Sequence, residues 1–158
     1  YFIQKEISNP MVVAPDIGSV KMARAYAKRL GAELGLVDKR RPKPDAVEVM
    51  NIIGEVEGHN VVLFDDLVTT ARTLCQAAEA VRRHGAKDVY AGVTHGVFAP
   101  GAMERLEKSP IRELVVTNTI SHPPGSIGAN VRELSVAGLL GEAVERIHEE
   151  RSLSSLFV

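Results

Sequence analysis

Short runs of apolar residues alternate along the chain with longer segments in which apolar residues recur at helical spacing. A run of roughly four to eight apolar residues is typical of a buried strand, whereas apolar residues three or four positions apart mark one face of an amphipathic helix. The runs predict strands at 11–14, 34–37, 47–53, 61–64, 89–94, 114–117 and 131–136. The helical spacing predicts helices at 20–30, 73–84, 100–106 and 137–149.

Strands and helices follow one another from the first residues to the last. This alternation predicts an α/β fold with a mainly parallel sheet that is flanked by helices on both faces. No internal repeat, low-complexity segment or composition shift marks a second domain boundary, so we expect a single domain over residues 1–158.

Polar or ionisable residues follow most of the predicted strands. The carboxyl ends of parallel strands lie at one edge of a sheet, and open α/β sheets bind ligands at that edge. The sequence therefore predicts a polar site there, built from Asp16, Lys39, Asp65, Asp66, His95 and Asn118.

The strongest local signal is the segment that follows the apolar run 61–64. Two acids, Asp65 and Asp66, precede Thr69, Thr70 and Thr73, and a helical pattern begins there. Free amides at a helix N-terminus suit a phosphate, and carboxylates suit sugar hydroxyls or a metal. The alternative is that Asp66 or Thr69 only caps the helix, but so many polar groups in so short a segment favour a ligand site. The segment contains no P-loop motif, so the predicted phosphate site is of another kind.

Composition excludes several classes of partner. The formal net charge is -1 and aromatic residues make up only 4%, which argues against nucleic-acid binding. No apolar run reaches membrane-spanning length, so we expect no membrane partner. The single cysteine, Cys75, has no partner for an internal disulfide, which favours a cytoplasmic protein, and its helical setting favours the core over a nucleophilic role. The histidines in turns or at helix ends are expected at the surface: His59, His84, His122 and His148.

The Asp65–Thr73 segment resembles the ribose-phosphate-binding motif of the type I phosphoribosyltransferase fold. Further segments, spread over nearly the whole chain, resemble the C-terminal half of ribose-phosphate pyrophosphokinase. They are residues 38–44, 48–54, 56–58, 94–97, 113–120 and 154–157.

The resemblance implies a reaction and roles for particular residues. Members of that family transfer the pyrophosphoryl group of ATP to ribose 5-phosphate. Asp65 and Asp66 are implied to bind the ribose hydroxyls, and Asp16 is implied to help bind Mg²⁺. Lys39 and Arg41 are implied to be catalytic cations on a mobile loop that closes over the triphosphate. The 5-phosphate is implied to lie against Thr69, Thr70, Ala71, Arg72 and Thr73.

The chain departs from the family pattern in sequence and in length. Thr69 stands where an acid is usual, and Arg72 and Ser19 stand where glycine is usual. The N-terminal half is absent, so we expect an isolated half or a piece of a longer protein, acting as a homo-oligomer or paired with an N-terminal half. Two other functions stay open: a non-catalytic regulatory relative that binds sugar phosphate or nucleotide, and a nucleobase phosphoribosyltransferase.

Overall fold

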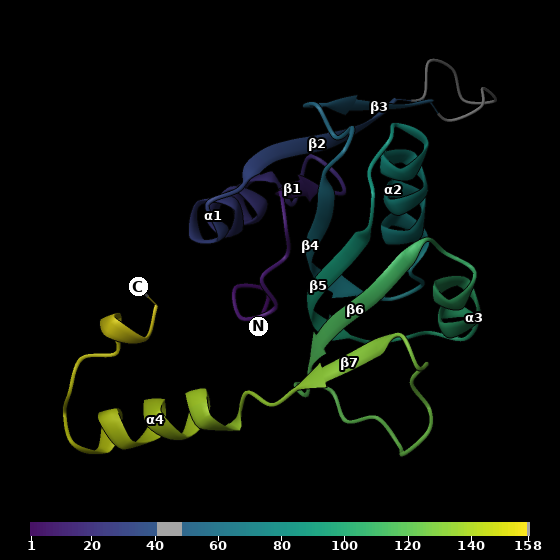
Figure 1. The fold of residues 1–158 in the computed structure, drawn as a ribbon. Coiled ribbons are helices and arrows are strands. Elements are labelled where there is room, and N and C mark those ends of the chain that lie inside the picture. The colour runs from purple at the N-terminus through teal and green to yellow at the C-terminus, as the bar shows by residue number, and fades with distance from the viewer. Residues whose placement is uncertain (41–48, 158) are drawn as a thin grey trace.

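One sheet organises the part of the chain that the computed structural model describes, residues 1–40 and 49–157 (Figure 1). Its seven strands in this part of the chain are β1 (Pro10–Ala14), β2 (Glu33–Arg40), β3 (Val49–Ile53), β4 (Asn60–Val68), β5 (Val89–Gly96), β6 (Ile111–Thr117) and β7 (Val131–Leu134). The helices are α1 (Val20–Leu30), α2 (Arg72–Arg83), α3 (Ala102–Glu107) and α4 (Ala137–His148), and a 3₁₀ turn, η1, spans Ser154–Leu156.

The strand order is β3-β2-β1-β4-β5-β6-β7, and every neighbouring pair is parallel except β2 with β3. The chain adds β2 on one side of β1 and later returns to add β4 on the other side. The connections therefore change direction between β1 and β4. Helix α1 covers one face of the sheet, whereas α2 and α3 cover the other (Figure 1). The predicted fold class is confirmed.

Strand β4 is buried on both faces, as its apolar run predicts. Val61 and Leu63 belong to the core cluster that includes most of the buried residues of α2. Val62 and Phe64 belong to the second cluster, which includes buried residues of α1. Successive strand side chains point to opposite faces, so four consecutive apolar residues supply both layers of the core.

The prediction for the segment after Val37 was wrong in part. The strand was predicted to end at Val37, and the family resemblance implied a loop that contains Lys39, but residues Asp38–Arg40 continue β2, and Lys39 lies opposite Met50 in the antiparallel pair with β3. Ladder hydrogen bonds to β3 stabilise a strand whose own residues have low β-propensity. The rest of the predicted loop, residues 41–44, and the start of the predicted strand 47–53 lie outside the described residues.

The C-terminal part of the chain leaves the sheet. Figure 1 shows α4 extending away from β7, and no residue of α4 is buried. Phe157 is 70% exposed, and its carbonyl accepts a hydrogen bond of 3.1 Å from the Arg29 guanidinium of α1. None of the described helices combines the length and apolar character needed to cross a membrane.

Candidate functional site

The predicted polar edge lies at the point where the sheet connections change direction. Strands β1 and β4 are neighbours, with Val13 opposite Leu63. Asp16 follows the end of β1, and Asp65 and Asp66 lie near the end of β4. Open α/β sheets bind ligands outside the carboxyl ends of the strands at such a switch point.

The two acids lie on β4 itself and not in the loop after it. The strand was expected to end at Phe64, but it continues to Val68, with Asp65 opposite Val93 of β5. Asp65 is half-buried, and Asp66 is exposed. The backbone amide of Asp66 donates to Oδ1 of Asp65 at 3.0 Å, which holds the first carboxylate against its own strand.

A cavity of about 180 Å³ lies directly beyond the strand, lined by Asp65 and by residues 67–74. It brings together Asp65 and all five residues of the predicted phosphate loop, residues 69–73. Asp66 does not line it but is the next residue along β4. The structure thus gathers the predicted loop around one concave site with a carboxylate at its edge.

The loop backbone presents donors. Ala71 has φ 59°, a left-handed conformation, and caps α2 without a side-chain hydrogen bond. Among the described residues, nothing accepts a hydrogen bond from the amides of Thr70 and Ala71. Such amides, together with the first turn of α2, bind anions well. Arg72 also lines the cavity and adds a positive charge.

Burial, together with the smaller effect of the nearby carboxylates of Asp16 and Asp66, raises the pKa of Asp65 to about 6. The charged form of Asp65 is therefore poorly stabilised without a ligand. A cation, or hydroxyl groups that donate to the carboxylate, would compensate for this loss of solvation.

Asp16 is held in place by Ser19. Oδ1 of Asp16 accepts from the amide of Ser19 at 3.0 Å and from its hydroxyl at 3.2 Å. Ser19 is the N-cap residue of α1, but its side chain makes no capping hydrogen bond, because its hydroxyl donates to Asp16 instead.

The residues at this edge fit a Mg²⁺ ion. Mg²⁺ prefers oxygen ligands and usually takes one or two carboxylates, completing its shell with phosphates and water. Asp16 and Asp65 are close enough for one carboxylate to raise the pKa of the other, and they supply such a pair. The described residues contain no cluster of three or more ligating side chains. A Mg²⁺ site of this kind does not need such a cluster, because phosphates and water supply the other ligands.

Of the two predicted catalytic cations, Lys39 lies in the described part of the chain and Arg41 does not. Lys39 was expected on a loop, but it belongs to β2. Its Nζ lies 3.4 Å from Oε1 of Gln76 in α2, one turn beyond the start of that helix. Arg41 lies outside the described residues.

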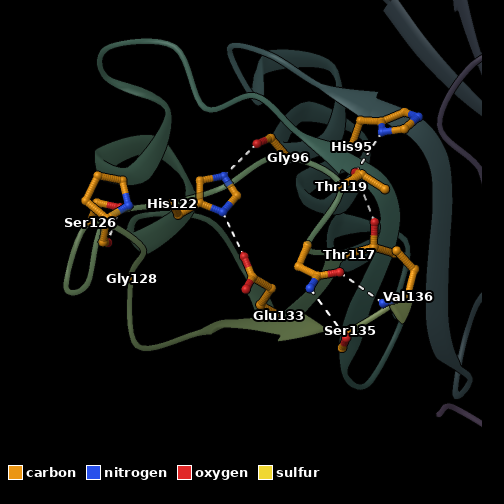
Figure 2. A network of polar contacts seen from close by, with 12 residues as sticks. His95, Gly96, Thr117, Thr119, His122, Ser126, Gly128, Glu133, Ser135 and Val136 are labelled. Carbon is orange, nitrogen blue, oxygen red and sulfur yellow. Dashed lines mark hydrogen bonds and ion pairs between the residues drawn. The ribbon is translucent and has the colours of Figure 1, made fainter. Parts of the chain in front are cut away.

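The ends of β5 and β6 form a polar network beside the site (Figure 2). Nδ1 of His95 lies 2.8 Å from the Thr119 hydroxyl, and the Thr117 hydroxyl donates to the carbonyl of Thr94 at 2.7 Å. His95 thus makes a structural hydrogen bond at the predicted edge.

His122 was expected at the surface, and that prediction was wrong. Its side chain is only 10% exposed and lies between two acceptors (Figure 2). Nδ1 lies 2.9 Å from Oε2 of Glu133, and Nε2 lies 2.7 Å from the carbonyl of Gly96. The hydrogen bond with Glu133 raises the pKa of His122. When both ring nitrogens are protonated, the imidazole donates to both acceptors and ties the 118–130 loop to β5 and β7.

Sequence reasoning also missed Arg105 of α3. Its guanidinium donates a hydrogen bond to the carbonyl of Thr70 in the predicted phosphate loop. The two residues are 35 positions apart. The only local pattern around Arg105 is that of a short amphipathic helix, so no sequence signal points to the contact.

Comparisons with known proteins agree with the resemblance seen in the sequence. The family model described as "Phosphoribosyl synthetase-associated domain" matches residues 37–158. Ribose-phosphate pyrophosphokinase of Caldanaerobacter subterraneus subsp. tengcongensis is 51% identical over 158 residues, which are 99% of this chain and 50% of that protein. Ribose-phosphate pyrophosphokinase of Maricaulis maris is 53% identical over 153 residues, which are 96% of this chain and 49% of that protein. The chain thus spans about half the length of the curated relatives that it matches.

Solved structures agree. Phosphoribosylpyrophosphate synthetase from Mycobacterium smegmatis superposes with a TM-score of 0.82 at 33% identity, over 90% of this chain and 46% of that chain. Orotate phosphoribosyltransferase from Aeropyrum pernix has a TM-score of 0.55 at 22% identity, over 91% of this chain and 73% of that chain. The second likeness shows a shared fold.

Proposed function

Because the chain belongs to the phosphoribosyl synthetase-associated domain family, we propose that it supplies the ribose 5-phosphate site of a ribose-phosphate pyrophosphokinase. One observation carries the proposal. Asp65 and the loop 69–73 line one cavity at the switch point of the sheet, so a carboxylate and a set of anion-binding amides face the same space. The hydroxyls of a sugar phosphate suit the carboxylate, and its phosphate suits the amides.

In the proposed reaction the 1-hydroxyl of ribose 5-phosphate attacks the β-phosphorus of ATP. The bond between the α-phosphate and the β-phosphate breaks, and AMP leaves. The hydroxyl proton passes to solvent or to a basic group, and the product is phosphoribosyl pyrophosphate. Asp65 and Asp66 hold the ribose hydroxyls and orient the attacking oxygen. Residues 69–73 hold the 5-phosphate at the N-terminus of α2.

Mg²⁺ held by Asp16, with Asp65 beside it, would neutralise charge on the triphosphate. Lys39 and Arg41 are the proposed cations that stabilise negative charge on the transferred group. The Lys39 ammonium reaches from β2 to Gln76 of α2. Gln76 lies within one helical turn of the cavity-lining segment, which supports the assignment of Lys39 as one of these cations.

We further propose that residues 1–158 act as one phosphoribosyltransferase-like domain of a two-half enzyme. The relatives named ribose-phosphate pyrophosphokinase are about twice as long as this chain. The remaining ATP contacts would come from an N-terminal half or from another copy in a homo-oligomer.

Calorimetric titration of this chain with ribose 5-phosphate, ribose and inorganic phosphate tests the site. We expect ribose 5-phosphate to bind more tightly than either part alone. A coupled assay for AMP, with ATP, Mg²⁺ and ribose 5-phosphate, then tests the activity with and without an N-terminal half. No detectable ribose 5-phosphate binding would refute the site.

One observation favours a second function, a regulatory relative that binds sugar phosphate without catalysis. Thr69 lines the cavity where an acid is usual in the family, so a carboxylate is absent beside the bound sugar. Binding of ribose 5-phosphate without AMP formation, even with the N-terminal half present, would support this alternative. Replacing Thr69 with Asp should then restore turnover if the missing carboxylate is the cause.

A further inference from the structure

Arg105 contacts the phosphate loop from outside the cavity. Its guanidinium donates to the carbonyl of Thr70, yet Arg105 is not among the residues that line the cavity. It therefore touches the backbone of the loop and not the space in which a phosphate would lie. Arg105 therefore differs from Arg72, which lines the cavity directly.

The contact determines the direction of a peptide group. The described backbone contains no cis peptide bond, so the carbonyl of Thr70 and the amide of Ala71 point in opposite directions. A donor that binds this carbonyl outside the cavity turns the amide of Ala71 the other way, toward the cavity side of the loop. A positively charged donor also polarises the peptide group, which makes its N–H a stronger donor.

The loop needs such support because its conformation is unfavourable. Ala71 is 4% exposed and has φ 59°, a conformation that costs a residue other than glycine about 1 kcal/mol. Nothing among the described residues accepts a hydrogen bond from its amide. A bond to the neighbouring carbonyl stabilises this arrangement before any ligand arrives.

Arg105 is itself held by the core. Ala102, three residues before Arg105 on α3, and Leu106, the next residue, are both 0% exposed. The thiol of Cys75, which is buried in α2, lies 3.7 Å from the carbonyl of Arg105. The backbone of Arg105 is therefore attached to the same helix whose N-terminus the loop caps.

We propose that Arg105 is a positioning residue that orients the amide of Ala71 toward the 5-phosphate. The inference rests on the proposed function, because it assumes that the loop binds a phosphate. It assigns a role in phosphate affinity to a residue that does not touch the ligand.

The test compares Arg105→Gln and Arg105→Lys with Arg83→Gln, in which an exposed arginine at the far end of α2 loses the same charge. We expect Arg105→Gln to weaken binding of ribose 5-phosphate about tenfold, the loss typical of one charge-assisted hydrogen bond. Binding of unphosphorylated ribose should not change, because the acids are untouched. Lysine still donates to a carbonyl, so Arg105→Lys should recover part of the affinity, and Arg83→Gln should behave like the parent chain.

Amide NMR spectra of the ligand-free protein separate positioning from direct contact. Arg105→Gln should shift the Ala71 amide resonance while the resonances of the α2 core stay in place, which also shows that the variant is folded. An unmoved Ala71 resonance, or ribose 5-phosphate affinity equal to that of the parent chain, would overturn the inference. If the parent chain binds no ribose 5-phosphate, the proposed function fails, and the Ala71 resonance alone decides whether Arg105 orients the loop.

Discussion

Helices α2 and α4 have the same length and opposite environments. Each contains 12 residues, and each carries apolar residues at helical spacing. Six residues of α2 are buried against the sheet, whereas none of α4 is. In α4 the apolar residues Leu140, Val144 and Ile147 are 58%, 67% and 63% exposed. Helical periodicity therefore predicts the element and its apolar face, but not whether nearby parts of the chain cover that face.

The difference matters for the site because the candidate phosphate loop is the N-terminal end of α2. A ligand site needs a support that does not move, and α2 is attached to the core along its whole apolar face. Helix α4 carries no comparable constraint within the described residues, and no part of the cavity comes from it. Variants at matched positions in the two helices can test this contrast.

The largest expected effect concerns ligand binding. Replacing Asp65 and Asp66 with Asn should weaken ribose 5-phosphate binding roughly 100-fold, because at each position a charge-assisted hydrogen bond of about 1.5–3 kcal/mol becomes a neutral one of about 0.5–1.5 kcal/mol. Replacing Glu142 and Glu145 of α4 with Gln removes the same charge and should leave the affinity unchanged. Calorimetric titration measures both, and equal affinities for the two double variants would remove the site assignment.

The next effect is on stability. Val81 of α2 is 0% exposed and Val144 of α4 is 67% exposed. Val81→Ala should lower the free energy of unfolding by about 2 kcal/mol, from lost burial and the cavity left behind. Val144→Ala should change it by less than about 0.5 kcal/mol. Urea denaturation gives both values, and a comparable loss from Val144→Ala would show that α4 is packed in solution.

A smaller effect links stability to the function of the site. Burial gives Asp65 a pKa of about 6 in the folded protein, above its ordinary value of 3.8, so the cost of its ionisation lowers stability as pH rises from about 4 to about 6 and stays constant above that. Asp65→Asn should therefore stabilise the protein at pH 8 by about 1 kcal/mol after allowance for solvent screening, or roughly 2–4 °C in Tm.

The stabilisation by Asp65→Asn should disappear as pH falls toward 4, where the Asp65 carboxyl of the parent protein is protonated in the folded state. Thermal melting at several pH values measures this, and Glu145→Gln in α4 is the control. A lower Tm for Asp65→Asn at pH 8 would contradict the prediction.

The smallest effect concerns the loop that precedes β7. The pKa of His122 is raised, so the stabilisation from its protonated ring is fully present below pH 6.5 and is lost as pH rises through the folded-state pKa. Hydrogen exchange of the 125–131 amides should accelerate between pH 6 and 8 beyond the intrinsic pH effect. His122→Gln should abolish this extra change, whereas His148→Gln in α4 should not. An unchanged profile in His122→Gln would exclude the imidazole as the cause.

Local pattern was enough for most of the architecture. The helix 20–30 was predicted to the residue, and Gly31 ends it with φ 59°, as a left-handed cap requires. The run 61–64 identified a strand buried on both faces. The acids and threonines after it identified the cavity-lining segment, because parallel strands all end at one edge. These features depend on residues adjacent in sequence, whose spacing alone determines which face or edge they occupy.

Contacts between distant segments decided the rest. Pairing with β3 extended β2 through Lys39, and Glu133 and Gly96 buried His122, although its Pro-rich surroundings are typical of a surface loop. The carbonyl of Thr70 meets Arg105 only because α3 packs beside α2. By itself, the sequence determined the order of the elements, the sheet edge and the chemistry of the loop. Tertiary structure decided which helix is covered and which distant side chains hold the loop, because burial and long-range hydrogen bonds depend on how the elements pack in three dimensions.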